Sequence, residues 1–125
     1  MSLLGRLLRD LGAVSAKRGA RVARHYHARA RWGRNLPALA LYFGTDKWGS
    51  HWYAEHYQRH FGALRRKRLR VLEIGIGGEA DSQLGGASLR MWKAYFPNAK
   101  IYGLDIADKR ARREPDKNLP GIAGR

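Results

Sequence analysis

Residues 71–78 read VLEIGIGG and residues 101–105 read IYGLD, and these two stretches decide the fold. Between them, residues 88–96 read SLRMWKAYF, a pattern that predicts a helix with Ser88 placed to cap it. A strand that ends in glycines, a crossover helix and a second strand that ends in an acid are typical of the start of a nucleotide-binding β-α-β unit. The sequence therefore predicts an α/β fold, with its first strand over residues 69–74 and its second over residues 100–104. The valine, leucine and isoleucine of the first strand suit a buried position in a parallel sheet.

The chain after the second strand is short. Only 20 residues follow Asp105, and residues 110–125 carry prolines, glycines and charges instead of an apolar pattern. We expect an irregular tail there and no third strand. A doubly wound sheet normally continues for several more strands, so the sequence is expected to be the N-terminal part of a larger domain, truncated by a premature stop, a frameshift or a fragmentary gene model. Such a part would leave strand edges and one sheet face uncovered, which predicts poor solubility.

The composition narrows the classes of partner. The chain has 125 residues, which is room for one domain at most, and its 25 Lys and Arg against 10 acids give a net charge of +15. Nucleic acid, anionic lipid and phosphate-bearing ligands are therefore to be considered. Because the charge is scattered and mostly Arg, a solvated basic surface explains it better, and nucleic acid is not expected to be a partner. No apolar run approaches the roughly 18 residues of a membrane span, and the absence of cysteine makes a cytoplasmic location the default.

Residues 1–34 are expected to form a basic, amphipathic helical region. Gly5 and Gly12 weaken an isolated helix, which favours a protein contact for its apolar stripe, either with the rest of the protein or with a second copy in a homo-oligomer, over a membrane surface. The stretch from Lys17 to Arg34 is expected to stay helical and largely solvated. The stripe consists of Leu3, Leu4, Leu7, Leu8, Leu11 and Val14.

Residues 35–68 are expected to form a helical segment that is interrupted by a loop. Asn35 can cap a helix with Pro37 in its first turn, and this helix should run to about Phe43. The stretch GTDKWG, residues 44–49, reads as an ordered loop, and Ser50 is placed to cap the next helix. The apolar face of that next helix carries Tyr53, Tyr57, Phe61 and Leu64.

The glycines after the first strand allow a sharp turn and a close approach of a ligand to main-chain N–H groups. They are Gly75, Gly77 and Gly78. The dinucleotide pattern G-x-G-x-x-G fails, because its last position, counted from Gly75, is Ala80. The turn therefore suits a ligand other than a dinucleotide.

Two acids favour a nucleoside without phosphates. Glu73 lies inside the first strand, where a carboxylate can accept from a cationic or hydroxyl-bearing ligand. Asp105, at the end of the second strand, can accept from both hydroxyls of a ribose. S-adenosylmethionine is a nucleoside of this kind.

Two stretches carry a resemblance to a known family. They are YFGTDKWGSHWYAEHYQRHFGALRRKRLRVLEIGIGG, residues 42–78, and GGASLRMWKAYFPNAKIYGLDIADK, residues 85–109. Together they resemble the class I S-adenosylmethionine-dependent methyltransferases that O-methylate sugars on macrolides and similar glycosylated natural products. Residues 69–109 would then be the first β-α-β unit of a Rossmann-like methyltransferase fold. One departure is Glu79, which stands at the last glycine of the family pattern [DE]-x-G-x-G-x-G.

The resemblance implies S-adenosylmethionine as cofactor and a glycosylated small molecule as methyl acceptor. The side chains and turns at the methionine and ribose end would be Glu73, Gly75 and Gly77, with Asp105 on the ribose hydroxyls. The segment that folds over the pocket would contain Thr45, Lys47, His51 and Tyr53. The family also uses Mg²⁺ and a histidine base, both expected beyond residue 125. We therefore assign no catalytic residue and no metal ligand in this chain and expect it to lack the catalytic half.

Two alternatives use other residues. His56 and His60 have metal-ligand spacing on a helix, but there is no H-E-x-x-H motif and no cysteine, so solvent-facing or hydrogen-bonded histidines explain them better. The other alternative is a non-catalytic basic binding or assembly module, which would use the apolar stripe for self-association and the Arg-rich stretch for nucleic acid or another anionic partner.

Four aromatic residues beside basic residues could also stack on bases of single-stranded nucleic acid: Trp48, Trp52, Tyr53 and Tyr57. Aromatic packing of a helix against the sheet explains them at least as well.

Overall fold

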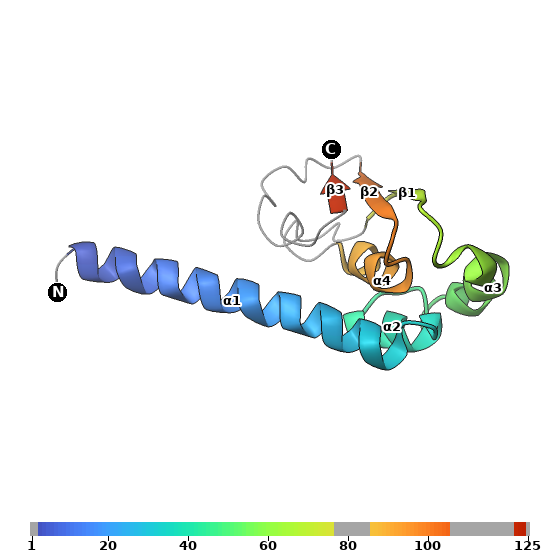
Figure 1. Cartoon of the computed structure of the whole chain (residues 1–125), viewed down its shortest axis with the longest axis horizontal. Coiled ribbons are helices and arrows are strands. Elements are labelled where there is room, and N and C mark those ends of the chain that lie inside the picture. Colours follow the sequence, from blue (N-terminus) through green and yellow to red (C-terminus); the bar gives the residue numbers. More distant parts are fainter. Residues whose placement is uncertain (1–2, 77–85, 106–121, 125) are drawn as a thin grey trace.

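The structure is a computed structural model that describes residues 3–76, 86–105 and 122–124. It is an α/β fold in which a long helix, α1, projects from a body of shorter helices and a small sheet (Figure 1). In chain order the elements are α1 (Leu3–Trp32), α2 (Leu36–Phe43), α3 (Tyr53–Phe61), the 3-10 helix η1 (Gly62–Leu64), β1 (Arg70–Ile74), α4 (Ala87–Tyr95), β2 (Lys100–Leu104) and β3 (Ile122–Gly124). The predicted β-α-β unit is thus confirmed as β1, α4 and β2.

The sheet has three parallel strands in the order β1-β2-β3. Val71 pairs with Ile101 and Glu73 pairs with Gly103, so these four residues face the same side of the sheet. Helix α4 covers that side and buries Ile101 completely. The two strands end in register, which places Glu73 and Asp105 at the same edge of the sheet.

The prediction that no third strand follows Asp105 is wrong. Strand β3 pairs with β2, with Ile101 opposite Ile122 and Gly103 opposite Gly124. Its sequence is Ile-Ala-Gly, which is too short to show alternation and contains two residues that disfavour strands. Residues 122–124 form a strand because they pair with the open edge of β2. The sequence of these three residues alone does not predict that pairing.

The core lies between α4, α2 and β2. The side chains of Met91 and Tyr95 in α4 and of Leu36 and Leu39 in α2 are fully buried. A Cβ atom on Gly103 would lie 2.8 Å from both Ile76 Cγ2 and Leu89 Cδ1, so a side chain at this position would collide with them. Glycine in β2 therefore allows the close approach of α4 and of the turn after β1.

The ends of α2 follow the sequence. Asn35 Oδ1 accepts a hydrogen bond from the Ala38 N–H at 3.0 Å, and Pro37 lies in the first turn, as predicted. Helix α2 ends at Phe43, and Gly44 takes the left-handed conformation with φ 69°.

Two predicted helix caps are wrong. Ser50 was expected to cap the next helix, but α3 begins at Tyr53 after Trp52, without a side-chain cap. The Ala54 N–H instead donates to the Lys47 carbonyl at 3.0 Å, so the loop backbone satisfies a donor of the first turn. Ser88 lies inside α4, which begins one residue earlier and follows Gly86 in the left-handed conformation. A buried, helical Ser88 cannot take the extended backbone of a cap.

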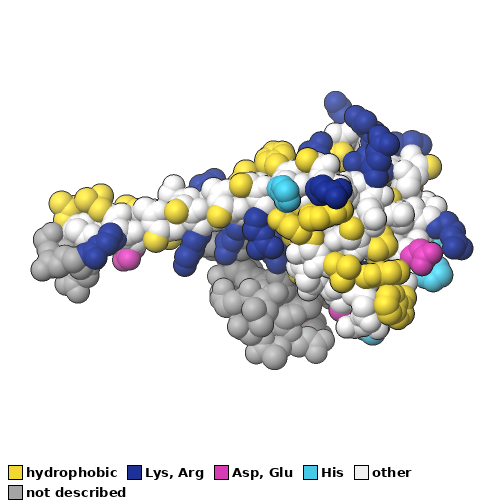
Figure 2. Space-filling view, turned by 90° about the horizontal axis from the view of Figure 1, so that it is seen from below, with side chains coloured by type: hydrophobic (Ala, Val, Ile, Leu, Met, Phe, Trp, Pro, Cys, Tyr) yellow, Lys and Arg dark blue, Asp and Glu magenta, His cyan; other side chains and the backbone are white. Residues whose placement is uncertain are grey.

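Helix α1 is continuous, and its two halves differ in their surroundings. The first half carries an exposed apolar stripe, the α1 stripe, whose described members are Leu4, Leu8, Leu11 and Val14 (Figure 2). The second half was expected to be largely solvated, which holds as far as Arg24. Beyond that point the prediction is wrong, because His25 and Ala28 are buried against the body.

One face of the sheet is exposed. Leu72 and Ile74 are 59% and 76% exposed, and Leu104, the register partner of Ile74, is also exposed. The sequence suggested a fully buried strand, since Val, Leu and Ile fill it. That prediction is wrong for these side chains because they alternate with Val71 and Glu73 and point away from α4. The expectation of an uncovered sheet face is confirmed at these positions.

Candidate functional site

The turn after β1 is tied to the end of β2. Gly75 has φ 78°, a conformation that glycine adopts without strain, and its N–H donates to the Leu104 carbonyl at 2.7 Å. The next N–H, of Ile76, donates to Asp105 Oδ2 at 3.0 Å. The two predicted binding positions Gly75 and Asp105 therefore lie side by side. A carboxylate has about four acceptor positions, so Asp105 can serve the turn and a ligand together.

Glu73 is held by two donors. Lys47 Nζ lies 3.1 Å from Glu73 Oε1, and their side chains are 18% and 11% exposed. On the other oxygen, the Trp92 indole Nε1–H donates to Glu73 Oε2 at 3.1 Å. The carboxylate thus joins the loop before α3 to strand β1 and helix α4.

The loop that carries Lys47 is anchored by Thr45. The Thr45 N–H donates to the Ala40 carbonyl at 3.0 Å, and its hydroxyl accepts from the Lys47 N–H at 3.0 Å. Thr45 is buried although it is polar, and these bonds satisfy it. It therefore fixes the backbone from which Lys47 reaches Glu73.

His51 and Tyr53 lie on the outside of this loop. Their rings stack with centroids 5.2 Å apart and an interplanar angle of 12°, and both side chains are exposed. His51 Nε2 also lies 3.8 Å from Asp46 Oδ2. The structure thus joins Thr45, Lys47 and Glu73 in one network. His51 and Tyr53 lie exposed at its edge, where His51 and Lys47 both approach the carboxylate of Asp46. Gly77, the remaining predicted position, lies outside the described residues.

Sequence reasoning missed Trp92. It assigned the surrounding segment to the crossover helix and gave the indole no role at the site. The ring of Trp92 packs against Tyr57 and Phe61 of α3 and against Phe96, with centroid separations of 5.4, 6.4 and 5.8 Å. The contact between Trp92 in a helix and Glu73 in a strand cannot be inferred from their separation in the sequence. The one signal that the sequence offered was an acid in a strand that is followed by an aromatic-rich crossover helix.

A second polar cluster lies where α1 packs on α4. Burial and, to a smaller extent, the like charges of Arg29 and Lys93 together lower the pKa of His25 from 6.5 to about 4. Lys93 Nζ donates to the carbonyls of Pro97 and Ala99 at 3.1 and 2.8 Å, and burial lowers its pKa too. Two of the carbonyls after α4 are thereby satisfied, so this cluster closes the helix end.

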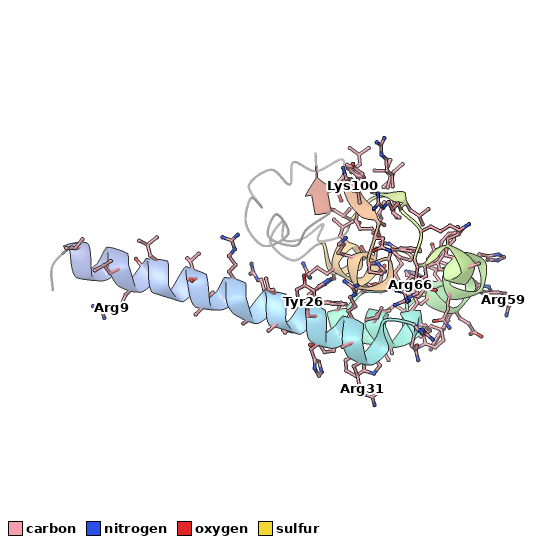
Figure 3. All side chains as sticks on the ribbon, viewed as in Figure 1. Arg9, Tyr26, Arg31, Arg59, Arg66 and Lys100 are labelled. Carbon is pink, nitrogen blue, oxygen red and sulfur yellow. The ribbon has the colours of Figure 1, made fainter. Side chains whose placement is uncertain are left out.

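Other cations point outward at separate places on the molecule. Arg9 and Arg31 lie on α1, whereas Arg59, Arg66 and Lys100 lie around the body (Figure 3). This spread is what a solvated basic surface predicts. His56 and His60 are exposed on α3, and the described residues contain no group of three His, Cys, Asp or Glu that could hold a metal ion. Within residues 3–76, 86–105 and 122–124, no helix is both long enough and apolar enough to cross a membrane.

The turn at Gly75 between the carboxylates of Glu73 and Asp105 has the arrangement expected for a class I S-adenosylmethionine-dependent methyltransferase, and the sequence and the fold both resemble that class. No family model matches the chain. It is 51% identical over 86 residues to the 8-demethyl-8-alpha-L-rhamnosyl tetracenomycin-C 2'-O-methyltransferase of Streptomyces olivaceus, over 66% of this chain and 23% of that protein. It is 47% identical over 100 residues to the L-olivosyl-oleandolide 3-O-methyltransferase of Streptomyces antibioticus, over 79% of this chain and 25% of that protein.

A solved structure agrees with these relatives. The MycE methyltransferase of the mycinamycin biosynthetic pathway, in complex with Mg, SAH and mycinamycin VI, has a TM-score of 0.63 and 44% identity, over 73% of this chain and 24% of that chain. The resemblance to sugar O-methyltransferases of natural products is thereby confirmed. The chain spans about a quarter of the length of the relatives it matches.

Proposed function

We propose that this chain forms part of the S-adenosylmethionine site of an O-methyltransferase that acts on a sugar hydroxyl of a glycosylated small molecule. The observation that carries the proposal is the joined pair of strand ends, where the Ile76 N–H donates to Asp105 Oδ2 beside the left-handed Gly75. The names of the similar proteins support the acceptor class, because they describe O-methyltransferases of glycosylated compounds.

The predicted roles remain proposals. Asp105 accepts from the ribose hydroxyls, and Gly75 and Gly77 let the cofactor approach the backbone. Glu73 faces the methionine end. The segment with Thr45, Lys47, His51 and Tyr53 folds over the pocket. The Lys47–Glu73 ion pair supports this role, because it links the segment to β1.

This chain contributes binding and orientation to the reaction. Methyl transfer requires the sulfonium carbon to lie in line with an activated hydroxyl, so most of the catalysis is positioning together with a base. The described residues supply carboxylates and a backbone turn for positioning. We propose that the Mg²⁺ ligands and the base belong to other parts of the methyltransferase, that this chain alone is inactive, and that the enzyme is cytoplasmic.

Calorimetry with S-adenosylhomocysteine tests the cofactor site. We expect saturable binding that Asp105→Ala weakens at least tenfold, because two charge-assisted hydrogen bonds to the ribose are lost. Asp10→Ala, which removes a carboxylate from the free half of α1, is the matched control and should leave the affinity unchanged. Equal weakening by both substitutions, or none by Asp105→Ala, would contradict the assignment.

The α1 stripe supports a second proposal, that two copies of the chain associate through α1. Four apolar side chains of the stripe are exposed, whereas α1 holds eight Lys and Arg and one acid. Pairing would bring like charges together, so association should strengthen as salt is raised. Binding to a nucleic acid or an anionic surface, which the basic-module alternative requires, should weaken with salt. Light scattering at 50 and 500 mM salt, with Leu8→Lys as the disrupting variant, separates the two.

A further inference from the structure

The indole of Trp92 donates to Glu73 of the candidate site, and the family resemblance assigned no role to this residue. We propose that Trp92 is a positioning residue, which orients the Glu73 carboxylate for the cofactor through its indole N–H. This inference rests on the proposed cofactor site and adds a residue of α4 to it.

The indole ring has little freedom to move. Trp92 is 5% exposed, and its ring packs nearly parallel to Phe96, with an interplanar angle of 23°. Tyr57 and Phe61, from α3, contact it edge-on at interplanar angles of 64° and 66°. Aromatic neighbours in α3 and directly after α4 therefore fix the direction in which the indole N–H points. That direction leads to Glu73 Oε2.

The two donors on Glu73 have different physical properties. Lys47 carries a full charge on a flexible stem with three rotatable donors, so it can follow the carboxylate as that group turns. The indole offers a single donor on a rigid, buried ring and cannot follow it. Lys47 therefore stabilises the charge of Glu73, whereas Trp92 selects one orientation of the carboxylate plane.

A fixed orientation matters for ligand binding. The strand fixes the backbone of Glu73, but only neighbouring groups can restrain its side-chain torsions. If the side chain became ordered only when the ligand binds, the lost conformational entropy would lower the affinity. With one acceptor position of each oxygen occupied, the remaining positions face a defined direction. The cofactor thus meets a carboxylate that is already ordered.

The test removes the indole N–H and keeps the aromatic packing. Trp92→Phe should raise the dissociation constant of S-adenosylhomocysteine about tenfold, the size expected for one hydrogen bond to a charged acceptor. Trp32→Phe is the control for the loss of an indole, because Trp32 is partly buried and packs on Tyr42 at 5.0 Å, away from Glu73. We expect Trp92→Phe to lower the unfolding midpoint more than Trp32→Phe, because it removes a hydrogen bond to a buried carboxylate. The affinity should change for Trp92→Phe alone.

A second readout needs no cofactor. In a ¹H–¹⁵N spectrum, the Trp92 indole signal should move upfield in Glu73→Ala, since the charged acceptor is lost, and should move less in Lys47→Met. An unchanged indole signal in Glu73→Ala would overturn the contact. If the wild-type chain binds S-adenosylhomocysteine and the Trp92→Phe variant binds it equally tightly, the positioning role alone is overturned. A wild-type chain that binds no S-adenosylhomocysteine would overturn the proposed site and the cofactor role of Trp92 together, while the spectrum would still report on the contact.

Discussion

Lys47 and Glu73 form a partly buried ion pair, with Nζ and Oε1 3.1 Å apart, that ties the loop after α2 to the first strand of the sheet. The pair connects segments that are 26 residues apart in the sequence. Lys47 also lies 3.9 Å from Asp46, but that carboxylate is mostly exposed. The contact with Glu73 is therefore the one that matters for the loop, because solvent screens it less.

Lys47→Met should destabilise the chain by about 1–3 kcal/mol, because it leaves the Glu73 carboxylate buried with only the indole as donor. Asp46→Ala should change the free energy of unfolding by less than about 0.5 kcal/mol. Urea unfolding measures both. The double variant Lys47→Met with Glu73→Gln should lose less than the sum of the two single changes; strict additivity would show that the pair contributes no interaction energy.

Gly103→Ala should destabilise the chain by about 1–3 kcal/mol, since its Cβ would overlap Ile76 and Leu89 and force α4 away from the sheet. The control is Gly12→Ala in the free half of α1, where a Cβ meets nothing within 4 Å. That change should stabilise the chain by about 0.5–1 kcal/mol through helix propensity. Thermal unfolding compares the two. A stable Gly103→Ala variant would mean that the turn at Ile76 packs less closely than the structure shows.

The stability of the chain should fall as the pH is lowered from about 6.5 to about 4, because burial holds the pKa of His25 near 4. Over this range the unfolded state takes up a proton that the folded state does not, so the free energy of unfolding decreases with falling pH and levels off below about 4. The full difference is about 3 kcal/mol at most. Urea titrations at several pH values should show this step in the wild type and in His60→Gln, but not in His25→Leu. An identical pH dependence in all three would contradict the assignment.

Asn35→Ala should destabilise the chain by about 1 kcal/mol, because the Ala38 N–H at the start of α2 loses its acceptor. Ser50→Ala should have almost no effect, since Ser50 caps no helix in the structure. Circular dichroism during urea unfolding measures both changes. If the two variants were equally destabilised, the serine would have a structural role that its position in the loop does not show.

Sequence reasoning succeeded where the physical cause is local. The bounds of β2 and α2, the Asn35 cap and the end of α2 before Gly44 follow from propensity, turn chemistry and spacing. It also placed Glu73 inside the first strand and Asp105 at the end of the second. The structure brings both acids to one edge of the sheet, because parallel strands joined by a crossover helix end together.

It failed where the cause lies in a distant part of the chain. Strand β3 forms because it pairs with the open edge of β2. The indole of Trp92 contacts Glu73 because aromatic side chains of α3 hold its ring in place. The exposure of Leu72 and Ile74 has the same origin, since a strand does not encode which of its faces will be covered. Each of these features depends on tertiary neighbours rather than on the residue's own segment.

Helix α1 also has a mechanical consequence. Its 30 residues extend about 45 Å at a rise of 1.5 Å per residue. Among the residues that the structure describes, those of the body bury α1 in its last turns, at His25 and Ala28. A tilt of about 10° at Trp32 would therefore move the tip by about 8 Å, so the helix acts as a lever that enlarges small rearrangements of the packing around Ala28. A fluorophore attached near Leu4 would make such rearrangements visible as changes in distance from the body.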